Sequence, residues 1–146
     1  METNATTESP AACPESFVPL FRSSPFLDAT GPYFCKPLGK GFVVGIRVEP
    51  RHTNSSGTAH GGLLATLADV SLGYVTATSQ DPPLRMTTTS LGLDYVGTAK
   101  LGAWLEAEVN VVKVGSRLAV ATALISSDGA PVASARAAFQ VVGQVT

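Results

Sequence analysis

Hydrophobic residues follow two different spacings along this chain, and the changes in spacing mark where strands give way to a helix. Between residues 33 and 49, two short apolar runs are separated by Gly39 and Gly41, which predicts a β-hairpin that ends before Pro50. One face of its second strand carries Phe42, Val44 and Ile46. Residues 17–33, with irregularly spaced apolar residues and prolines, are typical of a short helix or turn.

One long helix is predicted after a loop of small and polar residues. The loop reads RHTNSSGTAHGG over residues 51–62. In the sequence LLATLADVSLGYVTATS that follows, apolar residues occur at nearly every helical angle. This distribution predicts a helix that is buried on all sides.

Four strand-like stretches follow a break at Asp81, Pro82 and Pro83. They cover approximately residues 86–96, 103–114, 118–126 and 132–142, and the turns between them contain Gly97, Gly102, Gly115 with Ser116, and Asp128 with Gly129. Two strands, a long apolar helix and a run of antiparallel strands predict an α+β fold in which one curved sheet wraps around one helix. This is the plan of a hotdog fold.

Length and composition indicate one domain. The chain has 146 residues, of which 45% are hydrophobic, and this suits a single core over residues 17–146. Residues 1–16 are polar and Thr-rich, which predicts a disordered tail without the features of a secretory signal. No apolar run reaches the ~18 to 20 residues that a membrane span requires. Cys13 and Cys35 form neither a disulfide framework nor a zinc motif, so we expect a cytoplasmic protein without a metal.

Charge argues against a nucleic-acid partner. The formal net charge is −1 and the sequence pI is about 6.1, so the chain lacks the basic field that general nucleic-acid binders need.

The start and the middle of the predicted helix share one face. Seven residues at 100° each bring Gly62 and Asp69 within ~20° of each other, and Ala65, Thr66 and Gly73 complete a stripe of small residues there. A carboxylate among leucines and valines is costly to bury without a partner, so Asp69 is a candidate functional group. The alternative is a structural Asp that is hydrogen-bonded to a strand or lies at a solvent-facing edge.

The glycines at the start of the helix form a second candidate. Gly61 and Gly62 leave backbone N–H groups without intrahelical partners, and the helix dipole adds positive potential, so this end can polarise a carbonyl. The alternative is an ordinary Gly-rich loop. A rise of ~1.5 Å per residue separates Gly62 from Asp69 by about 10 Å, so one chain cannot present both to one carbonyl. Two helices related by a two-fold axis can, which predicts two composite sites per homodimer.

These residues resemble the phenylacetate-degradation (PaaI-like) hotdog thioesterases, over about residues 17–143. The shared signature is an Asn six residues before the His of a His-Gly-Gly, with an acidic residue nine after that His. Here the signature is Asn54, His60-Gly61-Gly62 and Asp69.

The resemblance implies hydrolysis of an acyl-CoA thioester without a metal or bound cofactor, coenzyme A being part of the substrate. Asp69 is then the general base or nucleophile. Gly61 N–H is the main donor to the thioester carbonyl with Asn54 contributing, Gly62 lies beside it at the substrate, and His60 shapes the loop. One such donor is worth ~3 to 4 kcal/mol in the transition state. The family also implies a homotetramer built from two dimers.

The resemblance further implies a hydroxyl that holds the attacking water, on the strand after the helix. Thr87, Thr88, Thr89 and Ser90 lie there, and alternation places Thr88 and Ser90 on one face. We expect Thr88 to be this hydroxyl, while the run is also compatible with ordinary strand surface.

Several other side chains have weaker assignments. Arg85, Lys113 and Arg117 are candidates for contacts with the phosphates of coenzyme A, the alternative being that they are solvated surface residues. His52 is expected to be a surface or loop histidine. Trp104, Phe139 and Tyr74 are expected in the core.

Two other functions remain open. A non-catalytic acyl-CoA-binding hotdog module has little need of a charge at Asp69, and regulators of that kind carry a DNA-binding unit for which residues 1–16 are too few. A hotdog hydratase or dehydratase is less compatible, because the chain lacks both the Gly-Asp-x-Asn-Pro-x-His segment and the His-Phe-Pro loop of those enzymes.

Overall fold

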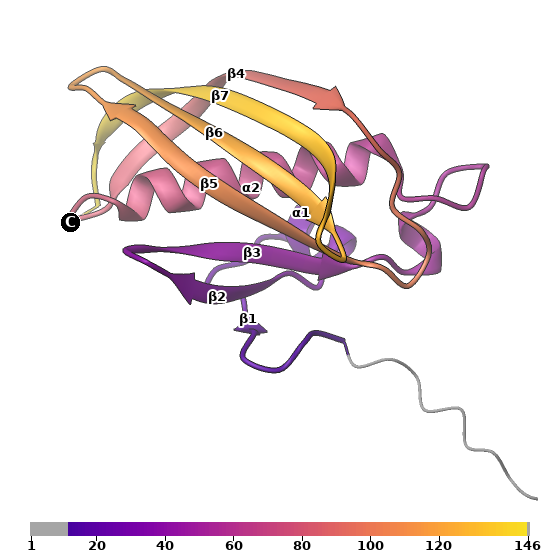
Figure 1. Cartoon of the computed structure of the whole chain (residues 1–146). Helices are drawn as coiled ribbons and strands as arrows, with labels where there is room; N and C mark the ends of the chain where they lie inside the picture. The colour runs from indigo at the N-terminus through magenta and orange to yellow at the C-terminus, as the bar shows by residue number, and fades with distance from the viewer. Residues whose placement is uncertain (1–11, 146) are drawn as a thin grey trace, which may run out of the picture.

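A seven-stranded antiparallel sheet curls around one long helix (Figure 1). The computed structural model describes residues 12–145. In chain order the elements are β1 (Val18–Pro19), α1 (Pro25–Thr30), β2 (Phe34–Leu38), β3 (Gly41–Arg47), a 3-10 helix (Pro50–His52), α2 (Gly61–Thr78), β4 (Leu84–Tyr95), β5 (Trp104–Val114), β6 (Leu118–Ser127) and β7 (Ala130–Gln144). The strand order is β1-β2-β3-β5-β6-β7-β4, so β4 lies at one edge of the sheet.

This architecture confirms the α+β hotdog fold and the predicted order of elements. The hairpin β2–β3 turns at Gly39, which has the positive φ of 57° that glycine adopts readily. The predicted disordered tail falls largely on residues 1–11, which lie outside the described residues. Residues 12–16 are described, and Cys13 packs against a small cluster next to the sheet.

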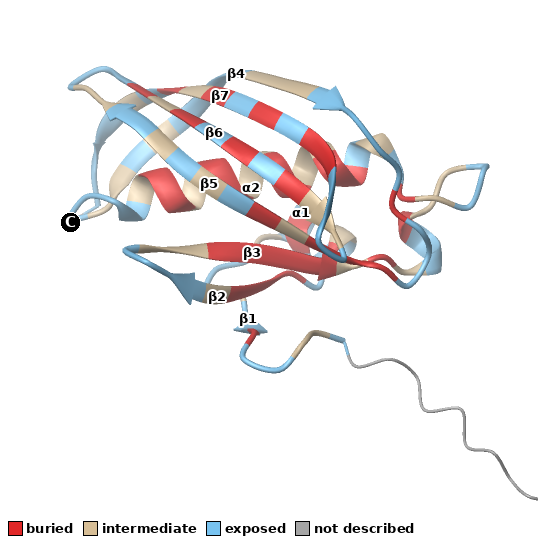
Figure 2. Ribbon diagram, viewed as in Figure 1, coloured by how far each residue is buried: buried red, intermediate tan, exposed pale blue. Residues whose placement is uncertain are grey.

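Small side chains under α2 let the sheet approach the helix closely. The inner faces of β6 and β7 carry six buried alanines, and the leucines of α2 fill the space above them: Ala119, Ala121, Ala123, Ala133, Ala135, Ala137, with Leu64, Leu67 and Leu72. Figure 2 shows the resulting alternation of buried and exposed residues along these strands. The main core is therefore the interface between α2 and the concave face of the sheet.

A second, smaller cluster covers the opposite face of β2, β3 and β5. It contains Phe17, Phe34, Val43 and Trp104. The Trp104 ring occupies the space that a side chain on Gly45 would need, since a Cβ there would lie 2.2 Å from ring atom Cζ2. Trp104 is thus a core residue, as expected.

One stripe of α2 is only half-buried in the single chain, so the prediction of a helix buried on all sides is wrong. The stripe, hereafter the open stripe, comprises Gly61, Gly62, Ala65, Thr66, Asp69, Val70, Gly73, Tyr74 and Ala77, of which Gly62 is exposed and the others are half-buried. It contains the small-residue face that the helical spacing predicted. The curved sheet covers the other sides of the helix and leaves this one open.

None of the helices in residues 12–145 is both long and apolar enough to span a membrane.

Candidate active site

The first turn of α2 presents a free backbone amide. His60 is the N-cap, with extended backbone angles (φ −63°, ψ 139°), and its Nδ1 accepts a hydrogen bond of 2.8 Å from the N–H of Gly62. The N–H of Gly61 has no hydrogen-bond partner within residues 12–145. The helix therefore begins with one capped amide and one available donor, at the positive end of its dipole.

In the third turn, a hydroxyl from β4 holds Asp69. Thr88 donates a hydrogen bond of 2.8 Å from Oγ1 to Oδ1 of Asp69. Thr88 is paired with Phe139 of β7, a buried residue, so its side chain lies on the inner face of the sheet toward α2. The predicted pairing of this hydroxyl with this carboxylate is therefore present in the structure.

A β-bulge separates Thr88 from Ser90. Thr88 is opposite Phe139 and Ser90 is opposite Ala138, so Thr89 is an extra residue in β4, and its hydroxyl donates to the carbonyl of Ala138 at 3.0 Å. The bulge moves Ser90 to the outer face, away from Asp69. The prediction that Thr88 and Ser90 share a face is wrong, because simple alternation does not hold across a bulge.

Asp69 and Thr88 open into a cavity of ≈ 570 Å³ between α1, α2 and the ends of β4 and β7. Its apolar walls are Phe26, Leu27, Val70, Gly73, Tyr74, Ala77, Leu84, Met86, Phe139, Val142 and Val145. Tyr74 and Phe139 were expected in the core alone, but they also line this cavity. The arrangement places one carboxylate on the wall of a cavity of the size of a small-molecule site, with both apolar and polar lining.

The start of α2 faces a different cavity. This second cavity, of ≈ 450 Å³, is lined by His60, Gly62, Leu63 and Thr66 of the helix start together with residues of α1 and the 3-10 helix, and Asp69 does not reach it. Gly61 and Asp69 are eight residues apart, about 12 Å along the helix axis. Gly61 itself lines neither cavity, so within one chain its free amide does not open into the cavity of Asp69.

The side chain of Asn54 forms its hydrogen bonds within its own loop. Its Oδ1 accepts from the N–H groups of Ser56 (2.9 Å) and Thr58 (3.2 Å), and its Nδ2 donates to Oγ1 of Thr58 at 3.0 Å. This Asx-type turn shapes the approach to His60, whose N–H bonds to the carbonyl of His52. Within residues 12–145, the hydrogen bonds of the Asn54 side chain are thus made to Ser56 and Thr58 of its own loop, and none is made to Gly61.

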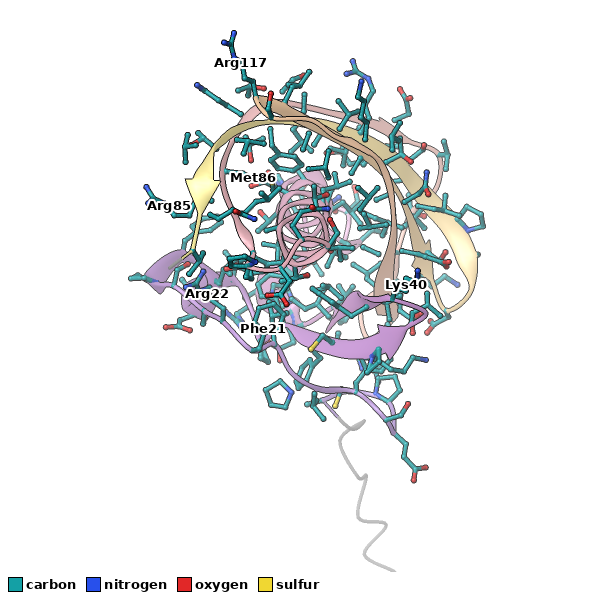
Figure 3. All side chains as sticks on the ribbon, turned by 90° about the vertical axis from the view of Figure 1, so that its left-hand side faces the viewer. Phe21, Arg22, Lys40, Arg85, Met86 and Arg117 are labelled. Carbon is teal, nitrogen blue, oxygen red and sulfur yellow. The ribbon has the colours of Figure 1, made fainter. Side chains whose placement is uncertain are left out.

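The predicted basic residues do not gather at one place. Arg85 lines the cavity of Asp69, and Arg22, from the segment before α1, lines it as well. Figure 3 shows these two arginines on the same side of the molecule, whereas Arg117 projects from a distant turn. Neither Lys113 nor Arg117 lines the cavity of Asp69.

Three residues near the site were missed or misjudged from the sequence. Arg22 lies in a segment without periodicity, so its proximity to Asp69 had no local signal. Tyr95, at the end of β4, donates a 2.8 Å hydrogen bond to the carbonyl of Gly61. His52 is buried rather than at the surface: Nδ1 accepts from the N–H of Glu49, and Nε2 bonds to the carbonyl of Thr30.

Other chemistries have less support in residues 12–145. No group of three or more His, Cys, Asp and Glu side chains is placed to hold a metal ion among them. Burial raises the pKa of the Cys35 thiol, which is outside both cavities, so this thiol is a poor nucleophile. Asp69 is the acidic side chain in the larger cavity.

Comparison with known families decides the class. Residues 56–133 match the family described as Thioesterase superfamily. The chain belongs to this superfamily. The match covers the end of the loop before α2, the helix itself and the strands as far as the start of β7, and thus includes His60, Asp69 and Thr88.

Curated relatives agree with this class. The chain is 50% identical over 129 residues to the Putative esterase PA0474 of Pseudomonas aeruginosa, covering 88% of this chain and 96% of that protein. It is 35% identical over 78 residues to Acyl-coenzyme A thioesterase 13 of Mus musculus, covering 53% of this chain and 54% of that protein. The protein is thus a thioester hydrolase by family.

Solved structures agree as well. A hypothetical thioesterase protein of Streptococcus pneumoniae, crystallised with coenzyme A, superposes with a TM-score of 0.71 at 28% identity, over 78% of this chain and 91% of that one. A variant of the phenylacetic acid degradation protein PaaI of Thermus thermophilus gives 0.71 at 29% identity, over 80% and 98%. These matches confirm the PaaI-like hotdog assignment.

Proposed function

We propose that this protein hydrolyses acyl-CoA thioesters to a free acid and coenzyme A, with Asp69 as the reactive carboxylate. The hydrogen bond from Thr88 to Oδ1 of Asp69, at the wall of the cavity, is the observation that carries this proposal. A carboxylate held by one oxygen in this way keeps its second oxygen for a water molecule or for the substrate carbon.

Either of two routes uses this carboxylate. As a general base, Asp69 accepts a proton from water while the water oxygen bonds to the thioester carbon, and the C–S bond breaks when the tetrahedral intermediate collapses. As a nucleophile, Asp69 bonds to that carbon itself, coenzyme A leaves as thiolate, and water then cleaves the mixed anhydride. In both routes the thiolate leaves and one water molecule is consumed.

The free N–H of Gly61 is the proposed donor to the carbonyl oxygen. It is unpaired within the described residues and lies at the positive end of an 18-residue helix. A backbone donor fixed in place stabilises the oxyanion without reorganising during the reaction. His60 contributes by capping Gly62, and Asn54 by holding the loop; neither is assigned a proton-transfer role.

We propose further that each site is completed by a second copy. The free amide and the carboxylate are about 12 Å apart along one helix. Asp69 lines one cavity, the neighbours of Gly61 line another, and Gly61 itself lines neither. The open stripe is rich in small residues, and β4 is an edge strand of 12 residues with a neighbour, β7, on one side. A two-fold axis beside β4 would bring the start of each helix to the Asp69 of its partner. The second copy would then cover both the open stripe and the free edge of β4.

The anionic part of coenzyme A fits the basic edge of the cavity. Arg85 and Arg22 line the same space as Asp69, and neither has an ion-pair partner within residues 12–145. A relative of the same fold has been crystallised with coenzyme A. We therefore assign the phosphate contacts to Arg22 and Arg85 rather than to Lys113 and Arg117.

Release of thiol from a panel of acyl-CoAs tests this proposal. We expect hydrolysis of at least one acyl-CoA by the wild type, and a fall in kcat of about 10²- to 10⁴-fold in Asp69→Asn, which retains an acceptor for Thr88. Binding of a non-hydrolysable acyl-CoA thioether should remain in both proteins. Binding without thiol release by the wild type would favour the binding-module alternative, and equal rates in the two proteins would remove Asp69 from the mechanism.

A further inference from the structure

We infer that Tyr95 is a positioning residue for the amide end of the active site. Its phenol fixes the peptide group between Gly61 and Gly62 and thereby aims the neighbouring Gly61 N–H. The inference rests on the proposed function in that the Gly61 N–H is taken as the donor to the thioester carbonyl.

Two contacts place Tyr95 against the first turn of α2. Its hydroxyl donates a hydrogen bond of 2.8 Å to the carbonyl of Gly61. Its ring covers the side-chain position of the same residue, since a Cβ on Gly61 would meet Cζ and the hydroxyl oxygen of Tyr95 at 3.3 Å. The tyrosine is half-exposed, so core packing does not account for these contacts.

The peptide that Tyr95 holds is restrained at both ends. Tyr95 binds its carbonyl oxygen, and Nδ1 of His60 accepts from its N–H at 2.8 Å. The residues on either side of this peptide are both glycines, which have more backbone freedom than any other residue. Two side-chain hydrogen bonds therefore restrict the one place in the helix where the backbone is least restricted by its own residues.

The direction of the Gly61 N–H depends in part on this restraint. This N–H belongs to the preceding peptide, whose His60 carbonyl accepts from the N–H of Leu63 at 2.9 Å and which is joined to the peptide held by Tyr95 through the φ and ψ angles of Gly61. A helix-start amide supports an oxyanion only when its N–H is held in the right direction before the reaction. The helix backbone holds the peptide before Gly61, and the side chains of Tyr95 and His60 hold the peptide after it.

Strand β4 connects this end to the other half of the site. Thr88 and Tyr95 belong to the same strand, and they bind Asp69 and Gly61 respectively. One strand thus fixes both the carboxylate and the amide end of α2, although the two groups are about 12 Å apart along the helix. In a dimer, the Tyr95 of one subunit would act on the site that contains its partner's carboxylate.

Kinetics of Tyr95→Phe test the inference, with Tyr33→Phe as the matched control. Tyr33 also makes one side-chain hydrogen bond, to Thr30, and it lines neither cavity of the proposed site. We expect kcat for acyl-CoA to fall roughly two- to tenfold in Tyr95→Phe with KM little changed. The reason is that a less well-oriented Gly61 N–H stabilises the transition state less but affects substrate binding little. Tyr33→Phe should retain the wild-type kcat. An unchanged kcat in Tyr95→Phe, or a change in KM alone, would overturn the inference.

Amide hydrogen exchange measured by NMR separates this inference from the proposed function. In Tyr95→Phe the Gly62 N–H should exchange faster, because its hydrogen bond to His60 loses the support of the fixed carbonyl, while Tyr33→Phe should leave it unchanged. Faster exchange in Tyr95→Phe, together with no thioesterase activity in the wild type, would retain the positioning role and reject the proposed function. Unchanged exchange of Gly62 in Tyr95→Phe would reject the positioning role itself.

Discussion

The two ends of the open stripe on α2 are built in contrasting ways. At the first turn the proposed reactive group belongs to the backbone: Gly61 has a free N–H, and the side chains of His60 and Tyr95 hold the peptide beside it. At the third turn the proposed reactive group is a side chain, the carboxylate of Asp69, held by the hydroxyl of Thr88 from another element. The first end thus uses a glycine, which has no side chain to shield its N–H, whereas the other end uses a specific pair of side chains.

This difference determines how each end responds to mutation. A carboxylate can be removed by a near-isosteric change, whereas a backbone amide survives almost every substitution. Proline is the exception, because it lacks the N–H. The first turn of a helix is also the one place where proline is well tolerated.

The largest effect among the following variants is expected for Gly61→Pro. Gly61 is the first residue of α2, and His60 before it has φ −63° and ψ 139°, the extended conformation that precedes proline most readily. The change removes the proposed oxyanion donor but breaks no hydrogen bond within the helix. The value of kcat should therefore fall by about 10²- to 10³-fold. Steady-state thiol release measures the loss.

Gly61→Ala is the matched control, because it adds a similar Cβ next to Tyr95 but retains the N–H. The melting temperatures of the two variants should be close. Equal kcat in the alanine and proline variants would show that the N–H of Gly61 has no part in the reaction.

A smaller effect is expected for Thr88→Val, which keeps the shape of the side chain and removes the hydroxyl that holds Asp69. A hydrogen bond to a charged group is worth about 1.5 to 3 kcal/mol, so kcat should fall about 10- to 100-fold. Thr89→Val, one residue along the strand, removes a hydroxyl that binds the carbonyl of Ala138 instead. If both variants lost activity equally, the effect would come from the strand and not from Asp69.

The smallest effect is expected at the basic edge of the cavity. Arg22→Met and Arg85→Met should each raise KM for acyl-CoA about two- to fivefold, since exposed charge pairs are weak, with kcat unchanged. Acyl-pantetheine thioesters, which lack the nucleotide phosphates, should be hydrolysed by these variants as by the wild type. Lys113→Met and Arg117→Met serve as controls outside the cavity. A larger increase in KM in these two variants would show that the phosphates bind at the β5–β6 turn instead.

The contrast between the two ends also explains what the sequence could predict. The order of elements, the long helix and the face shared by Gly62 and Asp69 follow from spacing along the chain. The resemblance added Thr88 as a partner of Asp69. The opposite facing of Ser90 could not be predicted, because the bulge at Thr89 depends on the register between β4 and β7.

Contacts between distant segments were the least predictable part. Arg22 reaches the cavity from an irregular segment, and Tyr95 meets Gly61 across 34 positions of the chain. The burial of the helix was overestimated, because its open stripe looks apolar and small in sequence while the sheet leaves it uncovered. Such features are set by tertiary packing, and a single sequence carries no periodic signal for them.

Mixing two inactive variants tests most directly whether each site is shared between two copies. Asp69→Asn and Gly61→Pro chains, co-refolded in equal amounts, should form mixed dimers in which one site combines an intact Gly61 with an intact Asp69. Half of the dimers would be mixed and one of their two sites restored, so thiol release should recover to about a quarter of the wild-type rate. No recovery, in a sample whose mass confirms that mixed dimers have formed, would contradict a composite site.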